Sequence, residues 1–171
     1  MTTASSAGTA AARVDWEGAD LVLSRVFAAP RELVFAAWTQ PEHFGQWWGP
    51  HESTTVVRTM DVRPGGLLHY CHQFAEGEFW IGAVYREVAP PERIAFDTFF
   101  ADASAARVDR PGFPESMTIT VTFAEHPDGT LVTARHQGLV EDQGEVEGWT
   151  QSLERLATLL SVINPSTGDD R

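Results

Sequence analysis

The sequence predicts an α+β fold in which a curved antiparallel sheet of about seven strands wraps around a long C-terminal helix. Two observations carry this prediction. Short segments rich in β-branched and aromatic residues follow one another, separated by turn residues. Near the C-terminus, "QGEVEGWTQSLERLATLLSVIN" repeats its apolar residues at helical spacing. Because this is the one long amphipathic helix predicted, it must cover the apolar face of the sheet.

One strand and two short helices are predicted before the main run of strands. The segment "ADLVLSRVF" alternates as a strand, and "PRELVFAAW" gathers its apolar residues on one helical side. Pro30 and Pro41 each suit the first position of a helix, because that position needs no backbone N–H donor. The second short helix is therefore predicted over Pro41–Gln46.

Two adjacent tryptophans, Trp47 and Trp48, stand where this second helix should end, before Gly49 and Pro50. Burial of apolar surface contributes about 25 cal/mol per Å², so both indole rings require cover. We expect the pair to close one end of the space between the sheet and the C-terminal helix.

Six further strands are predicted as an antiparallel meander. The clearest of them, "SMTITVTFAE", turns its apolar side chains to one face: Met117, Ile119, Val121 and Phe123. Residues 101–115, "ADASAARVDRPGFPE", are small and polar and include prolines, so they are predicted to form a loop that acts as a mobile lid or rim.

The length of 171 residues suits one domain, and a hydrophobic fraction of 43% is ordinary for a globular protein. We expect residues 1–18 to be a disordered leader, residues 19–164 to be the domain, and residues 165–171 to be a flexible tail. One domain of this size can bury about two thirds of its unfolded surface.

Charge and cysteine content exclude several classes of function. The chain has twelve basic and twenty-four acidic residues, which give a formal net charge of −12. This negative charge argues against nucleic acid or a membrane as partner. The single cysteine, Cys71, excludes an internal disulfide and a multi-cysteine zinc site, which is typical of a reducing compartment. Without a signal-peptide pattern, the sequence indicates a cytoplasmic protein, monomeric or homodimeric. It carries no phosphate-binding or metalloprotease motif, so no cofactor is predicted.

Several motifs, spread from Leu21 to Val162, resemble one known family. They read "FAAPRELVFAAWTQPEHFGQWWGP", "DVRPGG", "YREVAPPERIAF", "SMTITVTF" and "GWTQSLERLATLL". Together they are similar to the activator of heat-shock-protein ATPase homologue group within the START-like helix-grip (SRPBCC) superfamily. The resemblance implies a helix-grip fold, and its relatives include ligand carriers, polyketide cyclases and a co-chaperone domain.

The resemblance also implies which strand faces line the space beneath the helix. It turns Tyr70 and His72 of "LLHYCHQF", and His136 of "TLVTARHQG", towards the helix. Two inward histidines could act as general acid and base, or bind a ligand carbonyl or phenol; each could equally be a structural imidazole. No metal site is expected, because His69 and His72 point to opposite faces.

The candidate catalytic residues are therefore His72 and His136. Apolar residues of the cavity wall and polar residues that could hydrogen-bond a ligand complete the candidate ligand-binding set: Trp48, Tyr70, His72, Trp80, Phe96, Phe100, Met117, His136, Trp149, Ser152, Leu153 and Leu156. Gly148 is expected to allow a close approach of helix and sheet.

Three functions remain open from the sequence. The first is binding of a small apolar, aromatic or acyl-chain-like ligand. The second is a cofactor-independent enzyme of the cyclase, hydrolase or isomerase type. The third, implied by the family resemblance, is a module that interacts with a chaperone ATPase.

Overall fold

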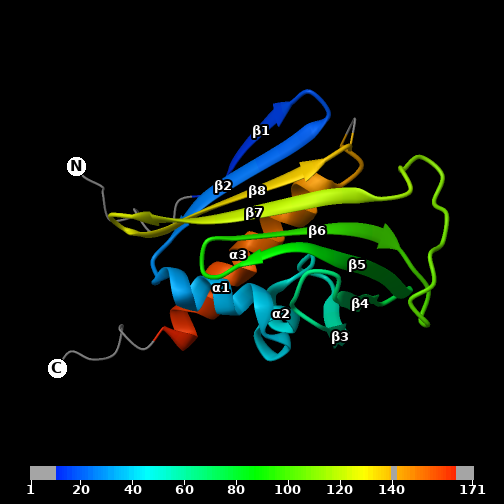
Figure 1. Cartoon of the computed structure of the whole chain (residues 1–171), viewed down its shortest axis with the longest axis horizontal. Helices are drawn as coiled ribbons and strands as arrows, with labels where there is room; N and C mark the ends of the chain where they lie inside the picture. The colour runs from blue at the N-terminus through cyan, green and yellow to red at the C-terminus, as the bar shows by residue number, and fades with distance from the viewer. Residues whose placement is uncertain (1–10, 140–141, 165–171) are drawn as a thin grey trace.

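The computed structural model describes residues 11–139 and 142–164. Within these residues an eight-stranded antiparallel sheet runs in the order β1-β2-β8-β7-β6-β5-β4-β3. The C-terminal helix lies behind the sheet in Figure 1, and the two short helices pack together below it. The predicted helix-grip architecture is confirmed, with one strand more than expected.

The helices and strands follow one another in the predicted order, apart from the additional first strand. The helices are α1 (Arg31–Thr39), α2 (Pro41–Trp47) and α3 (Glu145–Ile163). The strands are β1 (Arg13–Glu17), β2 (Asp20–Phe27), β3 (Thr54–Met60), β4 (Leu67–Phe74), β5 (Gly77–Ala89), β6 (Arg93–Phe100), β7 (Met117–His126) and β8 (Gly129–Gln137).

Strand β1 corrects the prediction that residues 1–18 form a disordered leader. Residues 13–17 pair antiparallel with β2 across a turn in which Gly18 has a φ of 65°. The side chains of this edge strand are mostly exposed, so the strand lacks the apolar face that would reveal it in the sequence. Residues 1–10 and the predicted tail, 165–171, lie outside the described residues.

The buried core lies between the inner face of the sheet and α3. The alternation predicted for β7 is confirmed, because Met117, Ile119, Val121 and Phe123 are all buried. The helix contributes a buried stripe that includes Leu153, Leu156 and Leu160. Apolar burial on both layers therefore holds α3 against the sheet.

A cluster of tryptophans joins the three helices to this core. The Trp38 ring of α1 lies 4.7 Å from Trp47, 5.7 Å from Trp48 and 6.2 Å from Trp149 of α3, centroid to centroid. The Trp47 indole N–H donates to the carbonyl of Ala37 at 2.8 Å, so its polar atom is satisfied while the ring is fully buried. The two adjacent tryptophans are thus covered, as expected.

The turn that follows the tryptophans is fastened to α3 by hydrogen bonds. The Gly49 N–H donates to Ser152 Oγ at 2.9 Å, and Arg155 donates to the carbonyls of Gly49 and Pro50 at 3.1 and 2.9 Å. Gly49 has a φ of 115°, and a Cβ there would lie 2.9 Å from the His72 ring. Glycine is therefore required at this position for backbone conformation and for space.

We expect Trp47→Ala to lower the free energy of unfolding by about 3–5 kcal/mol, because it empties a closed part of the core. Urea unfolding measures this change. Trp16→Ala is the control, since Trp16 is 39% exposed on the edge strand and should change stability little. Equal effects of the two substitutions would contradict the core position of Trp47.

Candidate functional site

A cavity of about 540 Å³ lies between the inner face of strands β4 to β8 and the first turns of α3. Its wall is mainly aromatic and apolar. It includes most of the predicted set: Trp48, Tyr70, His72, Phe100, Met117, His136, Trp149 and Ser152. The cavity therefore forms where α3 does not fill the concave sheet.

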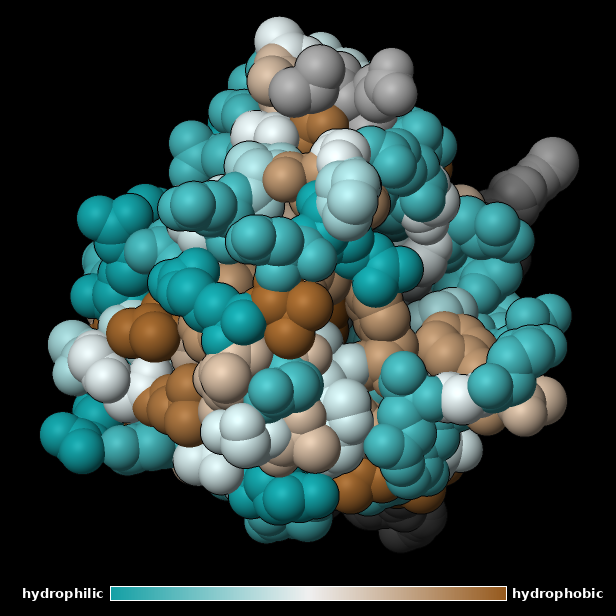
Figure 2. Space-filling view, turned by 90° about the vertical axis from the view of Figure 1, so that its right-hand side faces the viewer, coloured by the Kyte–Doolittle hydropathy of each residue, from teal (hydrophilic) through white to brown (hydrophobic). Residues whose placement is uncertain are grey.

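The loop between β6 and β7 reaches over the mouth of this cavity. Its Arg110 guanidinium lies 4.5 Å from the Phe79 ring and 5.2 Å from the Phe100 ring, and Phe113 packs on Phe100 at 5.0 Å. The Gln143 side chain donates to the carbonyl of Gly112 at 3.1 Å, which ties the loop to the segment before α3. Figure 2 views the molecule from this end and shows apolar residues exposed between polar ones. The predicted role as a mobile lid or rim stays a prediction.

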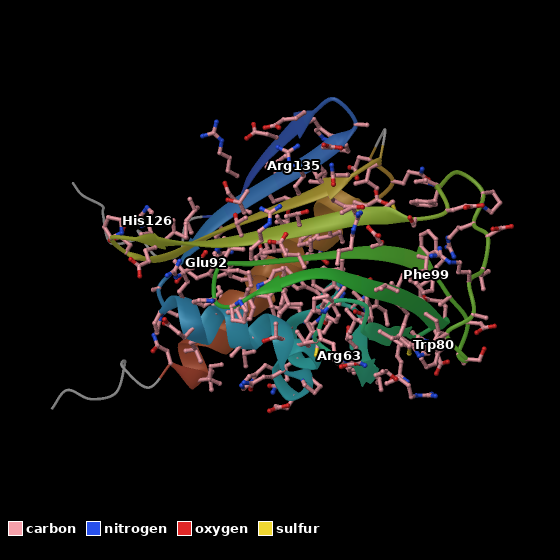
Figure 3. All side chains as sticks on the ribbon, viewed as in Figure 1. Arg63, Trp80, Glu92, Phe99, His126 and Arg135 are labelled. Carbon is pink, nitrogen blue, oxygen red and sulfur yellow. The ribbon has the colours of Figure 1, made fainter. Side chains whose placement is uncertain are left out.

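Trp80 does not line the cavity, which corrects its predicted role. In the antiparallel pair β4–β5, His72 lies opposite Phe79 and Cys71 lies opposite Trp80. Directly opposed residues share a face of the sheet, so the inward position belongs to Phe79. Trp80 is on the outer face, stacked on His69 at 4.8 Å, and Figure 3 shows it at the end of the sheet near the β6–β7 loop.

Three further predicted residues are inward but lie in the solid core rather than at the cavity. They are Phe96, Leu153 and Leu156, all buried. Phe96 packs on Tyr85 with ring centroids 5.8 Å apart. Only the N-terminal turns of α3 border the cavity, because its later turns pack closely against the sheet.

Gly148 also departs from its expected role. A Cβ added there would meet nothing within 4 Å, so this glycine does not serve a close approach of helix and sheet. It lines the cavity instead. The missing side chain leaves part of the space open.

Sequence reasoning missed the cavity residues Phe79, Ile81, Arg110 and Phe113. The first two could have been found, because an inward His72 and a two-residue hairpin turn place Phe79 and Ile81 on the same face. The two loop residues carry no periodic signal, since only the path of the chain decides which loop side chains reach the mouth.

His136 is held in one tautomer by its neighbour on α3. The Trp149 indole N–H donates to His136 Nδ1 at 3.1 Å, and an indole nitrogen can only donate. Nδ1 must therefore be the bare nitrogen, and the hydrogen of the neutral ring is on Nε2. Burial lowers the pKa of His136 to about 4, so the ring is neutral near pH 7.

His72 has the opposite arrangement. Thr55 Oγ1 donates its hydrogen to the carbonyl of Trp48, so it can only accept from His72 Nδ1, which lies 2.8 Å away. The hydrogen is then on Nδ1, and Nε2 carries a lone pair. Burial, together with the positive charge of Arg155, lowers the pKa of His72 to about 4.

The two imidazoles of the cavity wall are therefore in different tautomers. His136 carries its hydrogen on Nε2 and His72 carries its hydrogen on Nδ1, and both rings are uncharged near pH 7. Burial also raises the pKa of the Tyr70 hydroxyl, so this third polar group of the wall is uncharged as well.

An aromatic cavity beneath a helix that a curved sheet grips defines a member of the START-like helix-grip class. The chain belongs to the Activator of Hsp90 ATPase homolog 1-like protein family, whose profile matches residues 28–161. None of the curated proteins matches the chain.

Solved structures of several bacterial proteins have the same fold. A protein from Chromobacterium violaceum is 30% identical, with a TM-score of 0.73 and coverage of 84% of this chain and 97% of its own. Protein Ms6760 from Mycobacterium smegmatis is 25% identical, with a TM-score of 0.76 and coverage of 87% and 94%. A protein from Arthrobacter aurescens, 23% identical, has a TM-score of 0.79 and coverage of 93% and 98%, a likeness of fold. Among the described helices, none has both the length and the apolar character needed to cross a bilayer.

We expect the two cavity histidines to make stability depend on pH. Their folded-state pKa of about 4 lies below the ordinary value of 6.5, so between these values the unfolded chain binds protons that the folded chain does not. Their contribution is complete above about pH 6.5 and is lost as the pH falls towards 4. The loss amounts to about 2 kcal/mol per histidine between about pH 7 and about pH 5.

Urea unfolding of the wild type and of His136→Asn at both pH values measures this contribution. The variant removes one titrating group, so its stability should fall by about 2 kcal/mol less than that of the wild type. Parallel losses in the two proteins would show that His136 is protonated equally in the folded and unfolded chains.

Proposed function

We propose that this protein binds a small, largely apolar molecule, aromatic or acyl-chain-like, in the cavity between the sheet and α3. The observation that carries the proposal is the cavity itself: about 540 Å³, within the range of about 300–1,000 Å³ that is typical of small-molecule sites. Its aromatic wall supplies apolar contact, and a few polar groups supply orientation.

The glycine at position 148 favours the interpretation of the cavity as a binding site over its interpretation as a packing defect. A helix interior favours alanine over glycine by about 1 kcal/mol, and the cavity has room for a side chain at this position. A larger residue would improve both the helix and the packing, so the glycine lowers stability while it keeps the cavity open.

Binding is also favoured over acid–base catalysis by the state of the histidines. A general base works best when its pKa lies near the operating pH, whereas His72 has a pKa of about 4. His136 is a neutral imidazole near pH 7 and is therefore a poor source of protons. We therefore propose binding as the primary activity.

The test uses N-phenyl-1-naphthylamine, an uncharged aromatic fluorophore, together with thermal-shift screening of aromatic and acyl compounds. We expect the wild type to bind the fluorophore, and a ligand at 100 times its dissociation constant to stabilise the fold by about 2.7 kcal/mol. Gly148→Leu should weaken binding at least tenfold because its side chain occupies the cavity, and Gly148→Ala should weaken it less.

Trp80→Ala is the matched control, since it removes a large aromatic ring from the outer face and leaves the cavity wall intact. It should bind the fluorophore as the wild type does. The proposal is wrong if no compound stabilises the wild type, or if Gly148→Leu and Trp80→Ala bind the fluorophore equally well.

A further inference from the structure

The loop between β6 and β7 passes from the outer face of the sheet to the mouth of the cavity, and Figure 1 shows it projecting beyond the end of the sheet. We call residues 101–108 the stem and residues 109–115 the flap. From the different contacts of these two parts we infer that the flap opens and closes the cavity while the stem stays in place. The inference rests on the proposed binding function and concerns how access to that same site is controlled.

The backbone of the stem extends the sheet. The Ala101 N–H donates to the carbonyl of Trp80 at 3.1 Å, and the Val108 N–H donates to the carbonyl of Phe100 at 2.9 Å. Ala101 also pairs antiparallel with Arg107 as an isolated bridge. Both ends of the stem are therefore bonded to the backbone of regular strands, and this part of the loop should open rarely.

Side chains on the outer face of the sheet fasten the stem as well. His69 Nε2 lies 3.0 Å from the carbonyl of Asp102, and a carbonyl only accepts, so the imidazole donates. The Arg107 guanidinium lies 4.3 Å from the Phe99 ring. Phe99 is on the outer face because its neighbour Phe100 lines the cavity from the inner face. The stem is thus held from the side of the sheet opposite to the cavity.

The flap has weaker fastenings, and these lie on the cavity side. Phe113 packs on Phe100 at 5.0 Å, and the Arg110 guanidinium lies 5.2 Å from the same ring. Arg110 is exposed and Phe113 is half-buried, so these contacts bury little surface. In the described part of the chain, one hydrogen bond ties the flap to a segment outside the loop, from Gln143 Nε2 to the carbonyl of Gly112 at 3.1 Å. The flap should therefore open more easily than the stem.

Prolines make the flap a compact turn that can move as one piece. Pro111 and Pro114 have a fixed φ and no N–H donor, so neither can add a backbone hydrogen bond. The Phe113 N–H donates to the carbonyl of Arg110 at 3.1 Å across the turn, and Gly112 has a φ of 91°. This internal bond holds the turn together without attaching it to the sheet.

We call the hydrogen bond from Gln143 to Gly112 the latch, and its donor stands on a fixed base. Asp142 Oδ1 accepts the N–H groups of Gly144 and Val146 at 3.0 and 3.1 Å, which anchors the segment to the start of α3. The carbonyl of Gly112 can only accept, so the latch requires the amide N–H of Gln143. Removal of this donor should therefore release the flap.

The first experiment replaces Gln143 with glutamate, which keeps the length of the side chain and removes the N–H donor. Stopped-flow fluorescence measures the association and dissociation rates of N-phenyl-1-naphthylamine. We expect Gln143→Glu to raise both rates by about 2- to 10-fold, the factor that one hydrogen bond contributes, and to leave the dissociation constant unchanged. The flap has to open for entry and for exit, whereas a wall residue that only contacts the ligand changes the dissociation constant. Gln151→Glu is the matched control, because it makes the same change on α3 and its side chain is outside the cavity wall.

The second experiment needs no ligand. Gly148→Cys places a thiol in the open space of the cavity, while the natural Cys71 is 1% exposed and should react slowly. Labelling with the bulky reagent monobromobimane should become about 2- to 10-fold faster when Gln143→Glu is added, and labelling with the small reagent iodoacetamide should change less. Adding Gln151→Glu should alter neither rate.

Equal labelling and binding rates with and without Gln143→Glu would overturn the inference, and so would equal acceleration by Gln151→Glu. If the wild type does not bind the fluorophore, the proposed function fails, while thiol labelling still tests the flap. If Gly148→Cys does not fold, hydrogen exchange of the other variants takes its place. Gln143→Glu should then speed the exchange of the Phe113 N–H and leave that of Val108 unchanged, and unchanged exchange at Phe113 would contradict a released flap.

Discussion

The rest of the structure depends on the anchoring of the turn after Trp48 to the terminal helix. Arg155 and Ser152 reach from α3 to the backbone of Gly49 and Pro50, while Trp48 packs against Trp149 at 5.0 Å. This contact sets how far α3 stands from the sheet at its N-terminal end. The turn and Trp48 hold this end of the helix, and the hydrogen bond from Trp149 to His136 links it to β8, while a space remains beside these contacts.

The same contacts determine the chemistry of that space. Gly49 approaches the His72 ring closely, and the carbonyl of Trp48 takes the hydrogen of Thr55, which assigns the tautomer of His72. On the other side of the cavity Trp149 assigns the tautomer of His136. Contacts that hold the fold together therefore also fix the tautomers of the two histidines in the cavity wall.

Burial gives the site its neutrality. Both imidazoles lose hydration in the folded state, which lowers the pKa of each to about 4 and leaves two uncharged polar groups in an aromatic wall. Under the proposed binding function, shape and hydrogen-bond positions would decide which ligand fits, with little contribution from the charge of these two rings.

The sequence by itself determined the fold class and the two short helices, because the spacing of apolar residues differs between strands and helices. Strand alternation grouped Tyr70 with His72 on one face, and the family resemblance implied that this face and His136 are inward, where the structure has them. Only the tertiary structure decided that Arg110 and Phe113 reach the mouth of the cavity, because the position of a loop side chain depends on the path of the chain. The open space beside Gly148 was also visible only in the tertiary structure. The size of a cavity depends on the distance between helix and sheet, and no residue in the sequence encodes that distance directly.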